Sequence, residues 1–387
     1  MGWIQWIFSG IGTFILGLVQ KYIFRKKLEI NEKKLSVSDV KEIAQIVYNE
    51  NFYRLESIAK DKANKRKDEL LNLVINRISI LPSIYLNKFS EPYLQSALFE
   101  AIKAYAKTGD KILKELLVSL IFNLVKEKTR ALNSIVFEES IFIAPKLTEY
   151  QFDILSLVFL LLYAPNKNIN NWGDFEFYLR KYVLPFIKSV TLNPTCYRHF
   201  EYVGCAFIRE SYRSIEDVFY FYYTGLFSAG FKKERFQNNV DKDLKKYIDN
   251  DLLIPCYHDS SLFQINAINN KDIIRKCENL DLDSSTIFEI KRIQKEHLMN
   301  NKNIRKVILK IDENFSNLFS LWDKSFIKYL ELTSVGVAIG IANIERKIGE
   351  SLDFSIWINE DSGFDENEKN FLKIPKIMNG GLFQQED

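Results

Sequence analysis

The stretch Trp3–Phe24, WIQWIFSGIGTFILGLVQKYIF, decides what kind of protein this sequence encodes. It holds no acidic residue, and a helix that rises about 1.5 Å per residue over it is long enough to cross a hydrocarbon core of roughly 30 Å. Trp3 and Trp6 stand near one end, and three basic residues, 25–27, follow the other. These flanks predict a transmembrane helix over residues 1–24, with the N-terminus outside the cell and the body in the cytoplasm.

One side of this predicted helix is small and polar. With successive side chains about 100° apart, six such residues share a face: Gln5, Ser9, Gly12, Thr13, Gly17 and Gln20. In lipid, small residues let helix backbones approach closely, and polar side chains find partners on another helix or in water. We therefore predict that the six residues of this stripe line a pore or a helix–helix seam. The alternative is a single-pass anchor with incidental glycine and serine, and the sequence alone does not choose.

Composition bounds the rest of the chain. The 387 residues suffice for two or three compact units, and the formal net charge of +3 is too mild for a dedicated duplex-DNA binder. Aromatic residues make up 14% of the chain, which suits either buried cores or stacking platforms. The four cysteines lack CxxC spacing and would lie on the cytoplasmic side, so we interpret them as free core thiols: Cys196, Cys205, Cys256 and Cys277.

Helical periodicity dominates the chain after the first stretch. We expect a mainly α protein, in which residues 25–80 form a charged connector helix or helix pair and residues 81–236 form a helical cytoplasmic domain. Residues 237–358 read as an α+β part. It contains a hairpin that turns at His258–Ser261 and a long charged helix from Ser285 to about Asp312. Residues 359–387 read as a flexible acidic tail.

The most apolar run of the body, FDILSLVFLLLYA, raises the question of a second membrane span. It is too short, carries Asp153 near its start and ends at Pro165, so we interpret it as the central buried helix. Thr148 and Gln151 have capping-box spacing just before it. Upstream, Gly109 lies in a Thr-Gly-Asp turn between two apolar-faced segments, which predicts an antiparallel helix pair. Downstream, small residues in GVAIGIA predict close packing of one helix on another.

Between residues 197 and 235 the chain mixes basic and aromatic residues. Cations hold phosphates and rings stack on bases, so this mixture is typical of sites for single-stranded nucleic acid or a nucleotide messenger. The candidate ligand-binding residues are Arg198, His199, Arg209, Tyr212, Arg213, Lys232, Lys233 and Arg235. Core packing with surface charges explains the same composition.

Known catalytic and metal-binding motifs are missing from the sequence. It holds no HExxH, GxSxG, P-loop or kinase triplet, and its histidines and cysteines are too scattered for a metal site. Cys196 and Cys205 have His199 nearby but no identifiable orienting acid or oxyanion hole. We therefore expect a protein that is not an enzyme and has no metal or cofactor.

Three stretches carry a resemblance: SALFEAIKAYAKTGDKILKELLVSL, IAPKLTEYQFDILSLVFLL and LELTSVGVAIGIANIERKIG. They resemble a bacterial family of membrane-linked proteins with the APKLT and LTSVGVAIGIAN motifs. The architecture, a short N-terminal membrane helix on a helical cytoplasmic body, also resembles the membrane effector of Hailong-type anti-phage defence systems.

That second resemblance implies a function. It implies an oligomeric, tetrameric channel in the bacterial inner membrane, which a short oligodeoxyadenylate from a partner nucleotidyltransferase holds shut. Loss of the ligand during infection would open the pore, depolarise the cell and abort the infection. The alternative is a membrane-tethered sensor or scaffold that recruits a protein partner without forming a pore. A hydrolase acting on nucleic acid or lipid is the third and weakest hypothesis.

Overall fold

The computed structural model describes residues 37–350, except residues 83, 84, 86, 129, 130, 167, 189 and 190. The transmembrane helix predicted over residues 1–24 and the tail predicted over residues 359–387 lie outside the described residues. Within the described part, helices dominate and the strands form two sheets of two strands each, which confirms the mainly α class. None of the described helices combines the length and apolar character that a membrane crossing requires.

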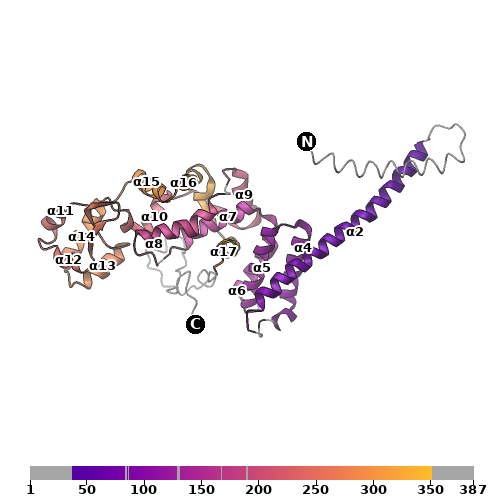
Figure 1. The fold of residues 1–387 in the computed structure, drawn as a ribbon, viewed down its shortest axis with the longest axis horizontal. Coiled ribbons are helices and arrows are strands. Elements are labelled where there is room, and N and C mark those ends of the chain that lie inside the picture. Colours follow the sequence, from indigo (N-terminus) through magenta and orange to yellow (C-terminus); the bar gives the residue numbers. More distant parts are fainter. Residues whose placement is uncertain are drawn as a thin grey trace.

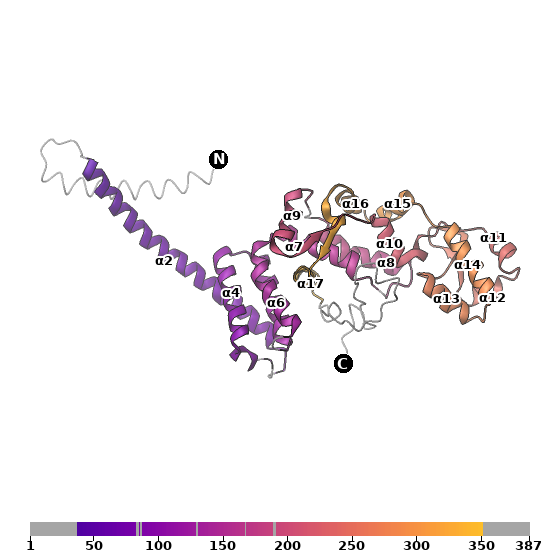
Figure 2. The same ribbon diagram turned by 180° about the vertical axis from the view of Figure 1, so that it is seen from behind.

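The first described element is a single long helix. Helix α2 runs unbroken from Val37 to Ile78, over 42 residues. Its N-terminal half extends away from the rest of the molecule, and its C-terminal half packs against other helices (Figures 1 and 2). Contact with these helices begins near Arg66, which donates a hydrogen bond to the carbonyl of Ala106 at 2.8 Å, and continues through the buried side chains of Leu70 and Val74.

The C-terminal end of α2 packs against a bundle of shorter helices. After the 3₁₀ turn η1 (Lys88–Ser90) come α4 (Pro92–Thr108), α5 (Lys111–Lys126), α6 (Leu132–Ile143) and the 3₁₀ turn η2 (Ala144–Lys146). Gly109, with φ of +67°, ends α4, and the Asp110 side chain caps α5, so the expected tight turn is present. Every residue of α5 from 116 to 125 is buried, because α2, α4 and α6 pack around it. We call α2, α4, α5 and α6 the helical bundle.

Helix α7 (Glu149–Val158) is the centre of the next part of the fold. The capping box between Thr148 and Gln151 is present as predicted, and the helix continues into the π-helical turn η3 (Phe159–Tyr163). All residues from 151 to 164 are buried. This confirms the interpretation of the apolar run as a buried helix: its hydrophobic residues face protein on all sides.

The remaining elements of this part surround α7, and we call them together the body. In chain order they are α8 (Trp172–Tyr178), η4 (Leu179–Val183), η5 (Leu184–Phe186), α9 (Pro194–Val203), β1 (Ala206–Ile208), α10 (Ile215–Tyr223), η6 (Thr224–Phe227), α15 (Asn301–Ile311), α16 (Phe315–Lys324), η7 (Phe326–Tyr329), β4 (Leu330–Leu332) and α17 (Ser334–Ile348). Strands β1 and β4 pair antiparallel, with Phe207 opposite Glu331.

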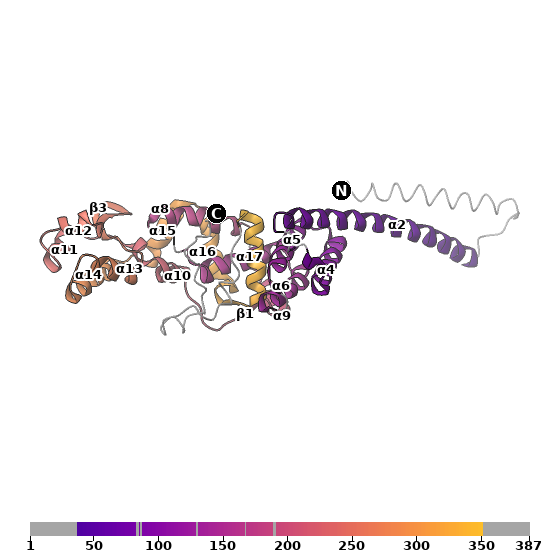
Figure 3. The same cartoon turned by 90° about the horizontal axis from the view of Figure 1, so that it is seen from below.

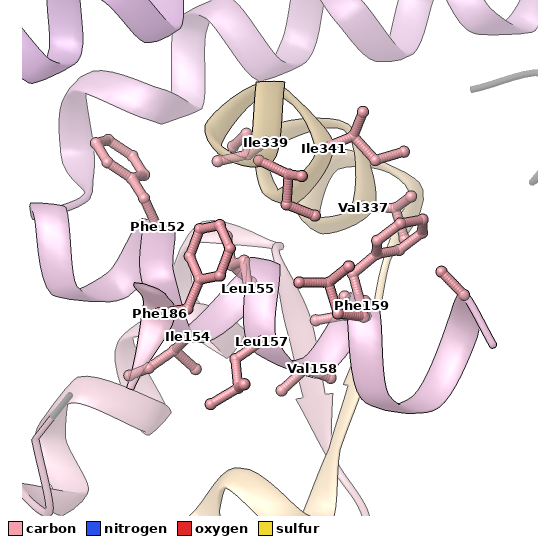
Figure 4. Close-up of a cluster of buried hydrophobic side chains, with 14 of the residues drawn as sticks. Phe152, Ile154, Leu155, Leu157, Val158, Phe159, Phe186, Val337, Ile339 and Ile341 are labelled. Carbon is pink, nitrogen blue, oxygen red and sulfur yellow. The ribbon is translucent and has the colours of Figure 1, made fainter. Parts of the chain in front are cut away.

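Helix α17 connects the helical bundle with the body. It contacts α5 and α6 on one side and α7 on the other, and it stands between the two parts in Figure 3. Its side chains Val337, Ile339 and Ile341 lie beside the apolar residues of α7 in Figure 4. A Cβ on Gly340 would lie 3.1 Å from the carbonyl carbon and oxygen of Leu155, so this glycine lets the two helices approach closely. The expected close packing of small residues is therefore present.

A lobe is inserted between α10 and α15. It comprises α11 (Lys233–Asn239), α12 (Lys245–Asp249), β2 (Leu253–Cys256), β3 (Asp259–Ile265), α13 (Asn270–Glu278) and α14 (Ser284–Glu296). We call residues 231–297 the inserted lobe. Its core is separate from the main one, and Phe231, Phe236 and Tyr247 belong to it. The boundary that we expected between residues 236 and 237 falls inside this lobe, because the chain returns to the body only after α14.

Two details of the lobe differ from the sequence predictions. The hairpin turns at Tyr257–His258 and not over residues 258–261, since Asp259 already pairs with Cys256 in the ladder. The charged helix expected from Ser285 to Asp312 is two helices, α14 and α15. It breaks because the Met299 amide donates to the Phe227 carbonyl at 2.8 Å, which draws the backbone out of the helix where the chain re-enters the body.

Replacement of Gly336 by alanine tests the packing of α17. A Cβ there would lie 2.0 Å from the Cys205 carbonyl oxygen, so Gly336→Ala should cost about 1–3 kcal/mol of stability and lower the melting temperature. Without that contact, alanine in a helix would stabilise by roughly 1 kcal/mol relative to glycine. Ser334→Ala in the first turn of the same helix is the control and should leave thermal unfolding nearly unchanged. A Gly336→Ala protein that melts at or above the wild-type temperature would contradict the close approach.

Candidate functional site

The predicted functional residues fall into two groups. The candidate pore residues Gln5, Ser9, Gly12, Thr13, Gly17 and Gln20 lie outside the described residues. The eight candidate ligand-binding residues are all described, but they do not form one site. Five belong to α9 and the segment after β1, whereas Lys232, Lys233 and Arg235 lie at the start of α11 in the inserted lobe, which extends away from α9 (Figures 1 and 2).

Exposed aromatic residues gather around β1. Tyr202 of α9 is 86% exposed, Phe207 of β1 is 59% exposed, and Tyr212 in the following segment is 55% exposed. The Tyr202 ring stacks on His199 with the planes 21° apart. Helix α9 packs against β1, and the Ile208 amide donates to the Glu201 carboxylate at 3.0 Å. These contacts bring α9 and the β1 segment together.

Cations accompany these rings. Lys328 of η7 places its Nζ 4.2 Å from the centre of the Tyr212 ring, and Arg209 pairs with Glu331 on the neighbouring strand. We call Tyr202, Phe207, Arg209, Tyr212 and Lys328 the aromatic–basic cluster. Exposed rings beside cations can stack on bases and hold phosphates. Glu331 offsets part of this positive charge, so stacking is the stronger property of the cluster.

The other predicted ligand residues play mixed roles. Arg198 is exposed, and His199 Nδ1 lies 3.0 Å from the Gln151 amide nitrogen. The Arg213 guanidinium lies 4.9 Å from the centre of the Phe221 ring, and burial lowers the pKa of Arg213. These three residues therefore flank the aromatic–basic cluster, and His199 and Arg213 also take part in packing.

The inserted lobe offers a weaker anion site. Arg235 pairs with Glu296, while Lys232 and Lys233 are exposed and form no ion pair with another described residue. Residues 231–297 contain twelve basic and twelve acidic residues. The lobe as a whole therefore has no formal charge that would attract a polyanion, and the hairpin has no electrostatic character of a DNA-binding wing.

The cysteine candidates do not have the properties of nucleophiles. Burial raises the pKa of the Cys196 and Cys205 thiols to about 12. A reactive cysteine needs a lowered pKa, because the thiolate is the nucleophile. All four cysteines are buried and free, as core thiols are. Among the described residues, no group of three or more histidine, cysteine or acidic side chains is placed to hold a metal ion.

A buried charge lies where α17 meets α7. Asp153 of α7 is fully buried, and its carboxylate oxygens accept hydrogen bonds from Asn343 at 3.0 Å and from Lys347 at 2.7 Å. The Asn343 amide also donates to Ser156 at 2.9 Å, and its carbonyl accepts two bonds from Arg346. A buried carboxylate needs such partners, so Asp153 fixes how α17 sits on α7.

A second buried charge lies on the opposite side of α17. The Glu345 side chain is 1% exposed, and its Oε2 lies 3.4 Å from Arg77 Nη2 and 3.3 Å from Asn123 Nδ2. Arg77, in the last turn of α2, also donates to Ser119 at 2.8 Å. We call Asp153, Asn343, Lys347, Glu345 and Arg77 the α17 clasp. It joins α7 to the end of α2 through one helix.

Sequence reasoning missed most of these residues. Tyr202, Phe207 and Lys328 are single residues in ordinary segments, and only the tertiary structure brings them to the predicted Arg209 and Tyr212. The α17 clasp could have been recognised in part from polar residues within or next to apolar runs of the sequence. Asp153 interrupts an apolar run, and Asn343 and Glu345 follow one, which is unusual for residues on a buried face.

Replacing Lys347 tests the clasp. Lys347→Met leaves the buried Asp153 carboxylate without its cation, so we expect a loss of roughly 3–5 kcal/mol of stability. Asp153→Leu combined with Lys347→Met removes both charges and should cost less than the single change. Thermal unfolding of the wild type, Lys347→Met, Asp153→Leu and the double variant measures the coupling between the two residues. Lys306→Met, at an exposed lysine of α15, is the control. Losses that simply add would contradict the pairing.

Comparison with known proteins shows a family but no individual relative. Neither the curated proteins nor the solved structures contain a match to this chain. A protein-family model, described only as “:-like”, matches residues 35–358. The match spans every described element from α2 to α17 and therefore includes the helical bundle, the body and the inserted lobe. The chain belongs to the family that this model defines.

Proposed function

We propose that this protein is a membrane effector of bacterial anti-phage defence. In this proposal its N-terminal segments assemble into an oligomeric pore or ion channel in the inner membrane, with a tetramer favoured. A nucleotide or short oligonucleotide, such as an oligodeoxyadenylate from a nucleotidyltransferase partner, binds the cytoplasmic part and keeps the pore closed. Loss of the ligand opens the pore, depolarises the cell and aborts the infection. The protein acts without catalysis.

The observation that carries the proposal is the connection of α2 to the body. A continuous helix of 42 residues is about 63 Å long, so a small rotation at one end moves the other end by several ångströms. Its C-terminal turn is held by Arg77 to the buried Glu345 of α17. A rearrangement of the body that moves α17 would therefore move α2, which leads back toward the apolar N-terminal stretch.

The energy that such a gate requires is modest. A ligand that binds the closed state roughly 3 kcal/mol more tightly than the open state changes the ratio of open to closed channels by about a hundredfold or more. Stacking of one base on an aromatic ring is worth about 1–3 kcal/mol. The exposed rings of the aromatic–basic cluster supply contacts of this size, and its cations suit a phosphate backbone.

A second candidate function is a membrane-tethered sensor or scaffold. Exposed tyrosine, phenylalanine and arginine side chains are also typical of protein–protein interfaces. Tyr202, at 86% exposed, and the pairing of Arg209 with Glu331 favour this alternative, because a neutralised arginine attracts phosphate weakly. In that case the cluster recruits a protein partner and residues 1–24 only anchor the chain.

Expression in bacteria separates the two functions. A channel without its closing ligand should collapse the membrane potential and stop growth, measured with a potential-sensitive dye. Charged substitutions at Ser9 or Thr13 should change the conductance. The matched control replaces residues 1–24 with an unrelated single-pass helix, which should abolish depolarisation. Correctly inserted wild-type protein that leaves the potential intact, or full function with the foreign anchor, would favour the tether.

Binding of a labelled short oligodeoxyadenylate to the purified full chain tests the ligand site. Phe207→Ala and Tyr212→Ala should each weaken binding roughly tenfold, the effect of losing one stacked base. Phe288→Ala is the matched control, because this phenylalanine of the inserted lobe is similarly exposed, at 65%. Fluorescence anisotropy gives the dissociation constants of the wild type and of the three variants. Equal affinities for all three variants would show that the ligand binds outside the aromatic–basic cluster.

A further inference from the structure

Helix α6 exposes an apolar stripe. Leu132, Ile135 and Phe142 are 59%, 46% and 44% exposed, although the other side of the same helix is buried in the main core. With Glu139, these residues follow one another at spacings of three, four and three, so they lie along one edge of the helix. Single exposed apolar residues are ordinary, but an apolar line on one helix face marks a surface that another helix can cover.

Two carboxylates lie at this stripe, Glu139 within it and Glu138 beside it. Glu138 and Glu139 form no ion pair with another described residue, and Glu138 is half-buried. Burial raises the pKa of the Glu138 carboxyl, and the negative charge of Glu139 raises it further. A cation from a partner would relieve this crowding of like charges. The surface on α6 therefore suits a helix that offers an apolar side chain with a basic residue nearby.

The projecting part of α2 has those properties. Residues 57–62 are all exposed, Ile58 is 42% exposed, and Lys62 forms no ion pair among the described side chains. Ile58 and Lys62 are four residues apart and so lie on the same side of the helix. Ile135 and Glu139 have the same spacing on α6. When the two helices run parallel with Ile58 against Ile135, Lys62 lies beside Glu139.

The two surfaces cannot meet within one chain. α2 packs on α4 and α5 from Arg66 onward, and its N-terminal half points away from α6 (Figures 1 and 3). The partner that presents an exposed α2 to an exposed α6 is therefore a second copy of this chain. Because the contacting surfaces differ, the contact is head-to-tail, and repetition generates a ring when the rotation closes.

We propose that α2 of one copy packs in parallel on α6 of the next copy, with Ile58 against Ile135 and Lys62 beside Glu139. This interface rests on the proposed oligomeric effector and names the surfaces that assemble it. The apolar residues provide the buried area. The ion pair adds little affinity at a surface but selects the parallel register.

Cysteine cross-linking in membranes tests the interface with the full chain. The natural cysteines are buried, so Ile58→Cys and Ile135→Cys in one chain provide the accessible thiols. Mild oxidation should join them between copies and give dimers and larger species on a non-reducing gel. Either cysteine variant alone is the control and should give little product. Absence of cross-linking between copies in the double variant overturns the proposal.

Charge exchange tests the register. In the two-cysteine background, Lys62→Glu or Glu139→Lys alone should lower the cross-linked yield roughly tenfold, and both together should restore it. Glu210→Lys, an exposed reversal elsewhere on the body, is the matched control and should have no effect. A cross-linked yield that neither single reversal lowers overturns the interface. A double exchange that does not restore the cross-linked product overturns it as well.

Membrane potential measured in the same cells separates this interface from the proposed function. Depolarisation without any cross-link between α2 and α6 overturns the interface and leaves the pore proposal standing. Cross-linking that follows the charge pattern in cells that stay polarised supports the interface and contradicts the pore.

Discussion

The backbones of α17 and α7 come close together at Gly340, where a Cβ would lie 3.1 Å from the Leu155 carbonyl. The rest of the fold depends on this contact, because at such a distance Asp153 and Asn343 are sealed from water. Asp153 then needs Asn343 and Lys347 beside it, and these partners accept only one rotation and one height of α17. Glu345 is thereby directed toward α5 and α2. The position of α17 on α7 therefore determines where the end of α2 is held.

Local interactions account for the features that could be predicted from the sequence. The capping box at Thr148 and Gln151, the turn at Gly109 and the burial of the apolar run after Asp153 all depend on residues within about ten positions of one another. The small residues of α17 predicted a close helix contact, although nothing in the sequence named α7 as the partner. The mainly helical class is predictable in the same way, from periodicity alone.

Tertiary interactions account for the features that could not be predicted. Helical periodicity continues across Leu298, and the break between α14 and α15 arises because the Met299 amide bonds to Phe227, some seventy residues earlier. The basic and aromatic residues between 197 and 235 look like one site in sequence. The inserted lobe removes Lys232, Lys233 and Arg235 from the others, and the fold brings in Lys328 from a distant segment. The candidate site was therefore only half predictable.

The position of α17 late in the sequence also sets the order in which the protein folds. During synthesis α2 to α7 leave the ribosome well before residues 334–348, so α5 stays partly uncovered and Asp153 lacks its lysine in the meantime. Helix α2 can pack on α4 and α5 as soon as these have emerged, but Arg77 reaches its partner Glu345 only after α17 has been made. The link from α7 through α17 to the end of α2 is therefore complete only when synthesis has almost finished.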